Sequence, residues 1–113
     1  MFQSAEFGKI VFDNRAFNED VVVRSNGSAM PRGPRPENHE ISWEEMKHYI
    51  DDRTRKVIVG TGFNGVLKVL QQTKEFLSSR GIELVEVKTQ EAIKLYNEER
   101  DKNGVVAVIH STC

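Results

Sequence analysis

The sequence predicts an α/β domain whose sheet is covered by helices on both faces. From Lys56 onward, apolar and helical patterns alternate in the order strand, helix, strand, helix, strand, a spacing that predicts right-handed crossovers. The N-terminal part instead has short apolar runs separated by polar turns, which predicts antiparallel strands. Residues 1–113 are long enough for a single domain with its own core, but too short for a dinucleotide-binding enzyme with a separate substrate domain.

The N-terminal strands are expected to be short. Asp13–Asn14 breaks the first apolar run, and Asn26–Gly27 predicts a hairpin because both residues tolerate the positive φ of a type I′ turn. The expected strands are Phe7–Phe12, Ala16–Phe17, Val21–Val23 and Ser28–Met30.

The segment Pro31–Glu40 contains all three prolines and lacks periodicity, which predicts an exposed loop. Loops of this length are functional in some proteins and of no special role in others, and the sequence leaves both readings open. Arg32, Arg35 and His39 make the loop mildly basic, and we interpret these charges as solvated.

Three helices are expected. Ser42–Glu45 fits a capping box, so the first helix begins at Trp43, with Met46 and Ile50 on the same apolar stripe. The second ends at Gly81, but Leu67–Leu70 fits either its first turn or a short extended piece. The third is Gln90–Lys102, capped by Thr89. The strands between and after the helices are expected at Val57–Val59, Ile82–Val87 and Val105–Ile109.

Composition excludes several classes of partner. The chain has 16 Lys and Arg against 17 Asp and Glu, a net charge of −1, so neither a nucleic acid nor an anionic membrane is favoured. The single cysteine, Cys113, cannot form an internal disulfide, which favours a reducing compartment. No apolar run approaches ~18 residues, and the first residues lack a targeting pattern. We expect a soluble cytoplasmic protein.

The most conspicuous motif is Lys56–Gly65, KVIVGTGFNG, a buried strand that runs into a glycine-rich turn. Its G-T-G-F-N-G spacing matches the dinucleotide fingerprint, and Glu86 lies where such proteins place a ribose-binding acid. Only three strands follow, however, and an extended Leu67–Val69 would start the helix too late to meet a phosphate. We expect no dinucleotide and no other cofactor.

No catalytic or metal-binding set stands out. His110 and Cys113 could join His39 and His48 in a metal site, but no second cysteine or close histidine pair supports this, and we expect His110 to bond a neighbouring loop. Ser111 should point to the opposite face of its strand from His110. The negative charge of a carboxylate beside Cys113 would disfavour its thiolate. We therefore predict no catalytic, cofactor-binding or metal-binding residue.

Several motifs together resemble a family of small domains of unknown function, which includes the adipogenesis-associated Mth domain-containing protein and a mitochondrial assembly factor for respiratory complex I. They are V-I-V-G-T-G at 57–62, L-K-V at 67–69, E-A-I-K-L-Y-N at 91–97 and V-A-V-I-H-S-T-C at 106–113. The resemblance implies a three-layer αβα domain around a mixed sheet, with an additional N-terminal β-hairpin element, and no established catalytic activity. It also implies a histidine before the first helix, which His39 matches, and often a proline where this chain has Leu70.

Two functional hypotheses follow. The first is a binding or assembly module without catalytic activity, with a protein as the candidate partner. The second is a small-ligand-binding protein or an enzyme with a cleft at the carboxyl ends of the parallel strands. The candidate pocket residues are Gly60, Thr61, Gly62, Asn64 and His110. The complex I role of the mitochondrial relatives is not carried over, because this chain shows no targeting extension, and the sequence predicts no oligomeric state.

Overall fold

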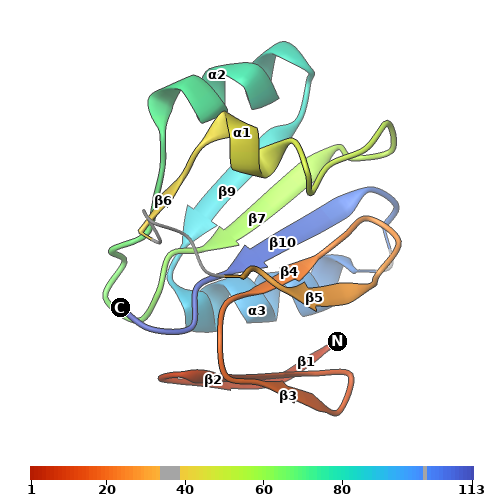
Figure 1. Ribbon diagram of the computed structural model, residues 1–113. Helices are drawn as coiled ribbons and strands as arrows, with labels where there is room; N and C mark the ends of the chain where they lie inside the picture. Colours follow the sequence, from red (N-terminus) through yellow and green to blue (C-terminus); the bar gives the residue numbers. More distant parts are fainter. Residues whose placement is uncertain (34–38, 101) are drawn as a thin grey trace.

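The computed structural model describes residues 1–33, 39–100 and 102–113. At its centre is a five-stranded mixed sheet with the strand order β5-β4-β10-β7-β9 (Figure 1). Strands β10, β7 and β9 are parallel, whereas β4 is antiparallel to β10 and β5 is antiparallel to β4. The strands are β4 (Val21–Val23), β5 (Ala29–Pro31), β7 (Lys56–Gly60), β9 (Glu83–Val87) and β10 (Val105–Ile109).

Helices cover both faces of this sheet, as the sequence predicts. Helices α1 (Trp43–Met46) and α2 (Gln71–Ser79) lie on one face, and α3 (Thr89–Glu99) lies on the other (Figure 1). Every residue of β10 is buried, with alternate side chains entering the two apolar cores on opposite faces. Within the described part of the chain, no helix is long and apolar enough to cross a membrane.

A second sheet forms a further layer outside α3. Its antiparallel strands are β1 (Phe2–Glu6), β2 (Lys9–Phe12) and β3 (Arg15–Phe17). The rings of Phe2 and Tyr96 meet edge to face at 5.4 Å, and the side-chain amide of Asn97 bonds both backbone groups of Phe2. The additional N-terminal β element is therefore confirmed, and it packs on α3.

The expected single strand Phe7–Phe12 is wrong at its beginning. Phe7 and Gly8 form the turn between β1 and β2, and Gly8 has a φ of 82°, which lets the chain reverse. The predicted break at Asp13–Asn14 is confirmed, with both residues at positive φ. A turn places Phe7 outside the sheet, whereas a strand would have placed it in the sheet.

The segment after the glycine loop is extended, not helical. Lys68–Val69 forms β8, which pairs in parallel with β6 (Glu40–Ile41). Leu70 keeps an extended backbone, with φ of −65° and ψ of 150°, and α2 starts at Gln71. This resolves the two alternatives for Leu67–Leu70 and separates the glycine loop from the helix N-terminus.

Two predicted helix caps differ from expectation. The Ser42 hydroxyl accepts a hydrogen bond from the Glu45 amide as predicted, although α1 lasts only four residues. The Glu45 carboxylate, expected to turn back to Ser42, accepts hydrogen bonds from Arg32 and Tyr49. Thr89 is not a cap; it is the first residue of α3, and its hydroxyl bonds to two loops.

Candidate functional site

The candidate site lies at the carboxyl ends of β7 and β10, where the glycine loop meets residues 110–113. The Phe63 amide donates to the Thr112 carbonyl at 2.8 Å, and the amides of Asn64 and Val66 donate to the Cys113 carbonyl at 3.1 and 3.0 Å. The chain itself therefore occupies the loop amides that a phosphate would need.

Gly62 packs directly against another backbone. Its φ is 101°, and a Cβ at this position would lie 2.6 Å from the Cys113 carbonyl oxygen and 2.9 Å from His110 Cδ2. Both distances are too short for a side chain, so glycine is required here for space as well as for conformation. Close packing, not ligand approach, explains this glycine.

The remaining candidate pocket residues belong to the same junction. Thr61 donates its amide to Val87 of β9, and Gly60 accepts from the His110 amide at 2.9 Å. Asn64 is exposed at the outer end of the loop. Thr89 joins the parts, since its hydroxyl accepts from the Gly62 amide at 3.0 Å and donates to the His110 carbonyl at 2.7 Å. The structure thus brings Gly62 and His110 together and leaves Asn64 at the rim.

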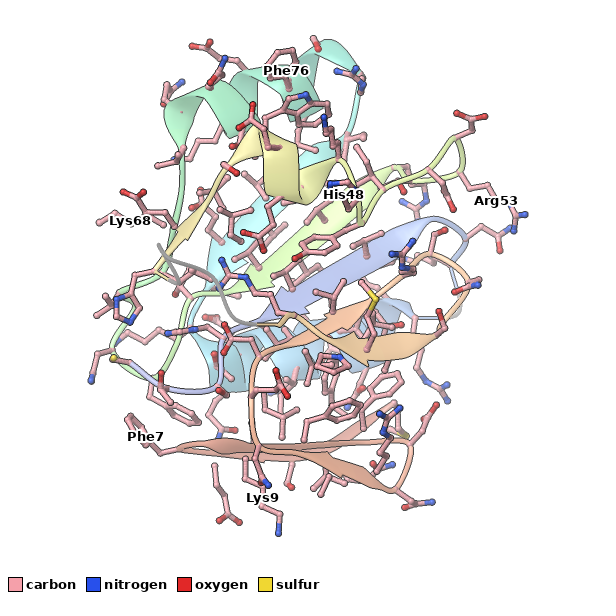
Figure 2. All side chains as sticks on the ribbon, in the orientation of Figure 1. Phe7, Lys9, His48, Arg53, Lys68 and Phe76 are labelled. Atoms are coloured by element: carbon pink, nitrogen blue, oxygen red, sulfur yellow. The ribbon has the colours of Figure 1, made fainter. Side chains whose placement is uncertain are left out.

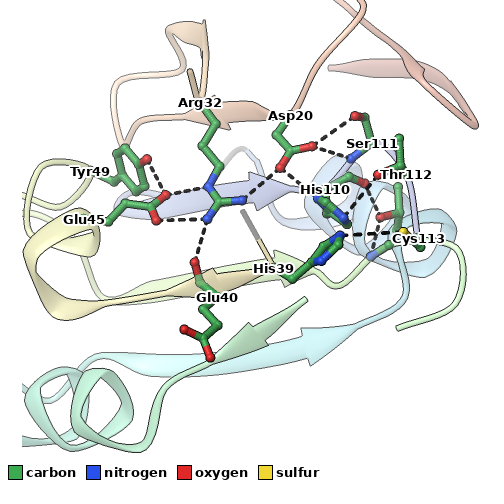
Figure 3. Close-up of polar contacts among 12 residues, drawn as sticks. Asp20, Arg32, His39, Glu40, Glu45, Tyr49, His110, Ser111, Thr112 and Cys113 are labelled. Atoms are coloured by element: carbon green, nitrogen blue, oxygen red, sulfur yellow. Dashed lines mark hydrogen bonds and ion pairs between the residues drawn. The ribbon is translucent and has the colours of Figure 1, made fainter. Parts of the chain in front are cut away.

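Arg32 connects two carboxylates beside this junction (Figure 3). Its Nε donates to Glu45 Oε2 at 2.6 Å, and its Nη1 donates to Asp20 Oδ2 at 3.0 Å. Only 1% of the side chain is exposed. The interpretation of Arg32 as a solvated loop charge is therefore wrong, because the guanidinium finds enough acceptors to offset the loss of water. Arg35 lies outside the described residues.

The network raises the pKa of Arg32. Burial alone lowers the pKa of a guanidinium, but the hydrogen bonds and charges of Glu45 and Asp20 outweigh burial and raise it above its ordinary value. Tyr49 donates its hydroxyl to the same Glu45 carboxylate at 2.6 Å. Arg32 is therefore held in its charged form.

Asp20 holds His110 and the following residue. Asp20 Oδ2 lies 2.8 Å from His110 Nδ1, and Oδ1 accepts from the amide and the hydroxyl of Ser111 at 2.8 and 3.0 Å. Burial raises the pKa of Asp20, but the hydrogen bonds from His110, Ser111 and Arg32 together lower it to about 2. The prediction that His110 bonds a neighbouring loop is confirmed. Ser111 does not pair with His110, but shares its carboxylate.

A second group of side chains faces the outer edge of His110. The rings of His39 and His110 meet edge to face at 5.3 Å, and Cys113 Sγ lies 3.6 Å from His39 Nε2 (Figure 3). Thr112 Oγ1 lies 3.3 Å from His110 Nε2. His48 is exposed beyond α1 and takes no part in this group. Of the four residues weighed for a metal site, the structure brings three together.

Sequence reasoning missed the acidic half of the site. Asp20 precedes β4 and Glu45 lies in α1, and the sequence gives Glu45 only a local role in a helix cap. The only available signal was two acidic residues beside apolar segments. That signal is too common to be specific.

The fold and the site together define a class: an αβα domain with a mixed sheet, an N-terminal antiparallel layer and a buried charged network at the carboxyl ends of its parallel strands. Residues 2–110 match the model of the family described as protein of unknown function (DUF498/DUF598). The chain belongs to this family.

Solved structures agree with this assignment. The conserved hypothetical protein PH1505 from Pyrococcus horikoshii is 28% identical, with a TM-score of 0.91 over 100% of this chain and 99% of that one. The structure titled MT938 is 31% identical, with a TM-score of 0.80 over 100% and 98% of the two chains. A Mth938-like domain from Bordetella pertussis is 15% identical, with a TM-score of 0.68 over 97% and 84%, and shows the shared fold alone. The resemblance found in the sequence is confirmed.

Proposed function

We propose that this domain is a cytoplasmic protein-binding or assembly module without catalytic activity. The observation that carries the proposal is the exposure of Phe7, which has 66% of its surface in contact with solvent at the turn between β1 and β2 (Figure 2). A phenylalanine at a turn adds little to the core, and clustered exposed apolar side chains are typical of interaction sites.

Phe7 belongs to a larger surface that we call the apolar patch, made of Phe7, Phe63 and Val66. The rings of Phe7 and Phe63 lie 6.0 Å apart, and Val66 is 39% exposed. Both contributing loops bond to the same segment: Gly8 donates its amide to the Ser111 carbonyl at 2.7 Å, and Phe63 and Val66 donate to the next two carbonyls. The fold therefore holds the patch in a fixed arrangement.

Another aromatic group on the opposite side of the molecule is already covered. Trp43 and Phe76 stack at 4.6 Å, and the Arg80 guanidinium lies 4.6 Å above the Trp43 ring, beside a groove of about 570 Å³. The Trp43 and Phe76 rings pack against each other, and the Arg80 guanidinium covers them. The contrast favours the apolar patch as the contact surface.

The charges beside the apolar patch indicate the chemistry of the partner. Lys68 and Lys88 are both exposed; Lys68 lies two residues after Val66, and the Lys88 side chain lies beside Gly65. A partner with an apolar centre and acidic groups at its rim would match both features. A protein is favoured over an anionic membrane because the chain carries a net charge of −1.

Affinity capture from extract of the source organism, followed by binding measurements with the purified partner, tests this proposal. We expect a partner that binds the wild-type chain, is lost with Phe7→Ser and is retained with Phe76→Ser, the matched aromatic control. Binding to anionic vesicles in place of a protein, or equal capture by Phe7→Ser, would overturn it. Folding of both variants is checked by circular dichroism.

A small-ligand site at the candidate pocket is the second hypothesis. It is favoured by the Asp20–His110 pair, which lies at the carboxyl ends of parallel strands, where α/β proteins usually bind ligands. The occupied loop amides and the lack of space at Gly62 count against it. A thermal-shift screen with nucleotides and small anions separates the two, because a ligand at 100 times its Kd stabilises the fold by about 2.7 kcal/mol.

A further inference from the structure

We propose that His39, His110 and Cys113 bind a divalent transition-metal ion, with zinc as the best match to the ligand set. The atoms that each would offer lie within 4.8 Å of one another. The sequence alone led us to expect no metal, because these residues show no regular ligand spacing. The position of His39 beside the other two side chains changes that expectation.

The distances already approach those of a tetrahedral site. Zinc bonds of about 2.0–2.3 Å place neighbouring ligand atoms roughly 3.3–3.7 Å apart. Cys113 Sγ and His39 Nε2 are 3.6 Å apart, within that range. The widest of the three separations must close by about 1 Å, which small side-chain rotations can supply.

The surroundings of His110 orient its ring for metal binding. Asp20 Oδ2 lies 2.8 Å from His110 Nδ1 and also accepts from the Arg32 guanidinium, so this contact favours the tautomer with the His110 proton on Nδ1. In the neutral ring, Nε2 then keeps a lone pair, which faces Thr112 Oγ1 at 3.3 Å and the other two candidate ligands. A carboxylate behind a histidine is the arrangement that commonly supports a metal ligand. Asp20 would act as this positioning residue.

The chemistry of the three donors selects among metals. Imidazole nitrogen and thiolate sulfur suit zinc, whereas magnesium and calcium prefer oxygen ligands. Three protein ligands leave one tetrahedral position, which water can fill. A metal here would cross-link His39, just before β6, to His110 and Cys113, which follow β10. These two segments are far apart in the sequence.

The test uses untagged, reduced and metal-free protein. Isothermal titration with zinc chloride should show one zinc per chain. Titration with Co²⁺ should give the near-ultraviolet charge-transfer band of a cobalt–thiolate bond. Cys113→Ser should lose this band, and both Cys113→Ser and His39→Ala should weaken zinc binding by about 10-fold or more. His48→Ala is the matched control, because His48 is exposed and lies outside the group, and it should bind like the wild type.

The two replaced ligands are only partly buried, so their variants should fold, and circular dichroism checks this. His110→Ala is unsuitable as the main test, because the ring is buried against Asp20. Absence of saturable zinc binding in the folded wild type would overturn the proposal. So would unchanged affinity in either ligand variant, or a charge-transfer band that survives Cys113→Ser. Phe7→Ser should keep its zinc, so this proposal and the proposed function can fail separately.

Discussion

The two ends of the parallel strands carry similar sets of charges in different surroundings. At the amino ends, Lys56 lies 2.6 Å from Glu99 and 3.8 Å from Glu83, which is 64% exposed. At the carboxyl ends, Arg32 also lies between two carboxylates, but its side chain is almost fully enclosed. Water reaches Glu83 freely and Lys56 and Glu99 in part, at 11% and 13% exposed, whereas the Arg32 and Glu45 side chains are only 1% and 5% exposed. Loss of one carboxylate partner should therefore cost less stability around Lys56 than around Arg32, where each charge depends on the others.

This difference explains why the carboxyl end can support a site. Asp20 can orient His110 only if its own position is fixed, and Arg32 fixes it from the other side. A network whose members each depend on the others holds one geometry. At the amino end, Lys56 makes one close ion pair, with Glu99, and the more distant Glu83 is 64% exposed, so no comparable network forms among these three residues.

The largest expected effect comes from removing the central cation of the enclosed network. Arg32→Met leaves Asp20 and Glu45 buried without a counter-charge, and we expect a loss of about 3–5 kcal/mol in the free energy of unfolding. Lys56→Met, the control at the amino end, should lose less, about 1–2 kcal/mol, because Glu83 is mostly exposed and Glu99 keeps some contact with water. Urea unfolding measures both. Equal losses would show that enclosure does not distinguish the two ends.

The second prediction uses pH to discharge the same network. The pKa of Asp20 is lowered to about 2, so its ionised form stabilises the fold above the ordinary carboxyl range, and this contribution is lost as the pH falls toward 2. The free energy of unfolding of the wild type should drop by up to about 2 kcal/mol relative to Asp20→Asn between about pH 5 and pH 2. Glu99, whose pKa is also lowered, is present in both proteins, so its titration does not contribute to the difference between them. A constant difference between the two proteins would contradict the role given to Asp20.

The third prediction concerns packing at the carboxyl end. Gly62→Ala should destabilise the protein by about 1 kcal/mol or more beyond Gly81→Ala. Both glycines have positive φ, but an added Cβ at Gly81 meets open space, whereas at Gly62 it meets the Cys113 carbonyl and His110. Urea unfolding of the two variants isolates the clash from the backbone strain. Equal free energies of unfolding for the two variants would mean that the segments around Gly62 move apart at little cost.

The sequence predicted the features that depend on neighbours along the chain. Apolar runs marked β7 and β10, and the glycine pattern marked the tight turn in which the structure gives Gly62 a positive φ. The αβα layers required only the order of these elements and the resemblance to a family.

The sequence could not predict contacts between distant residues. His110 bonds to Asp20 across 90 positions, and Cys113 approaches His39 across 74. Arg32 looked like a solvated charge because its partners come from two other elements. Phe7 looked like part of a strand because Gly8 marks a turn only once the pairing of β1 with β2 is known. Local pattern carries no information on such pairings.

The smallest expected effect is none: the loop from Gly60 to Gly65 should not bind a dinucleotide. Its glycines match the fingerprint, but β8 intervenes before α2, so the helix that follows the loop in sequence does not begin at it. The first residue of α3, Thr89, does lie at the loop, but its amide and hydroxyl are already bonded to Gly62. The amides of Asn64 and Val66 are already bonded to Cys113, and a phosphate would have to displace that segment. Isothermal titration with NAD(H), NADP(H) and ATP up to about 1 mM should give no binding heat, although a site worth about 4 kcal/mol would be half filled there. Micromolar binding that Gly62→Val abolishes, in a variant shown to be folded, would move the carboxyl end into the class of nucleotide sites that its glycine spacing suggests.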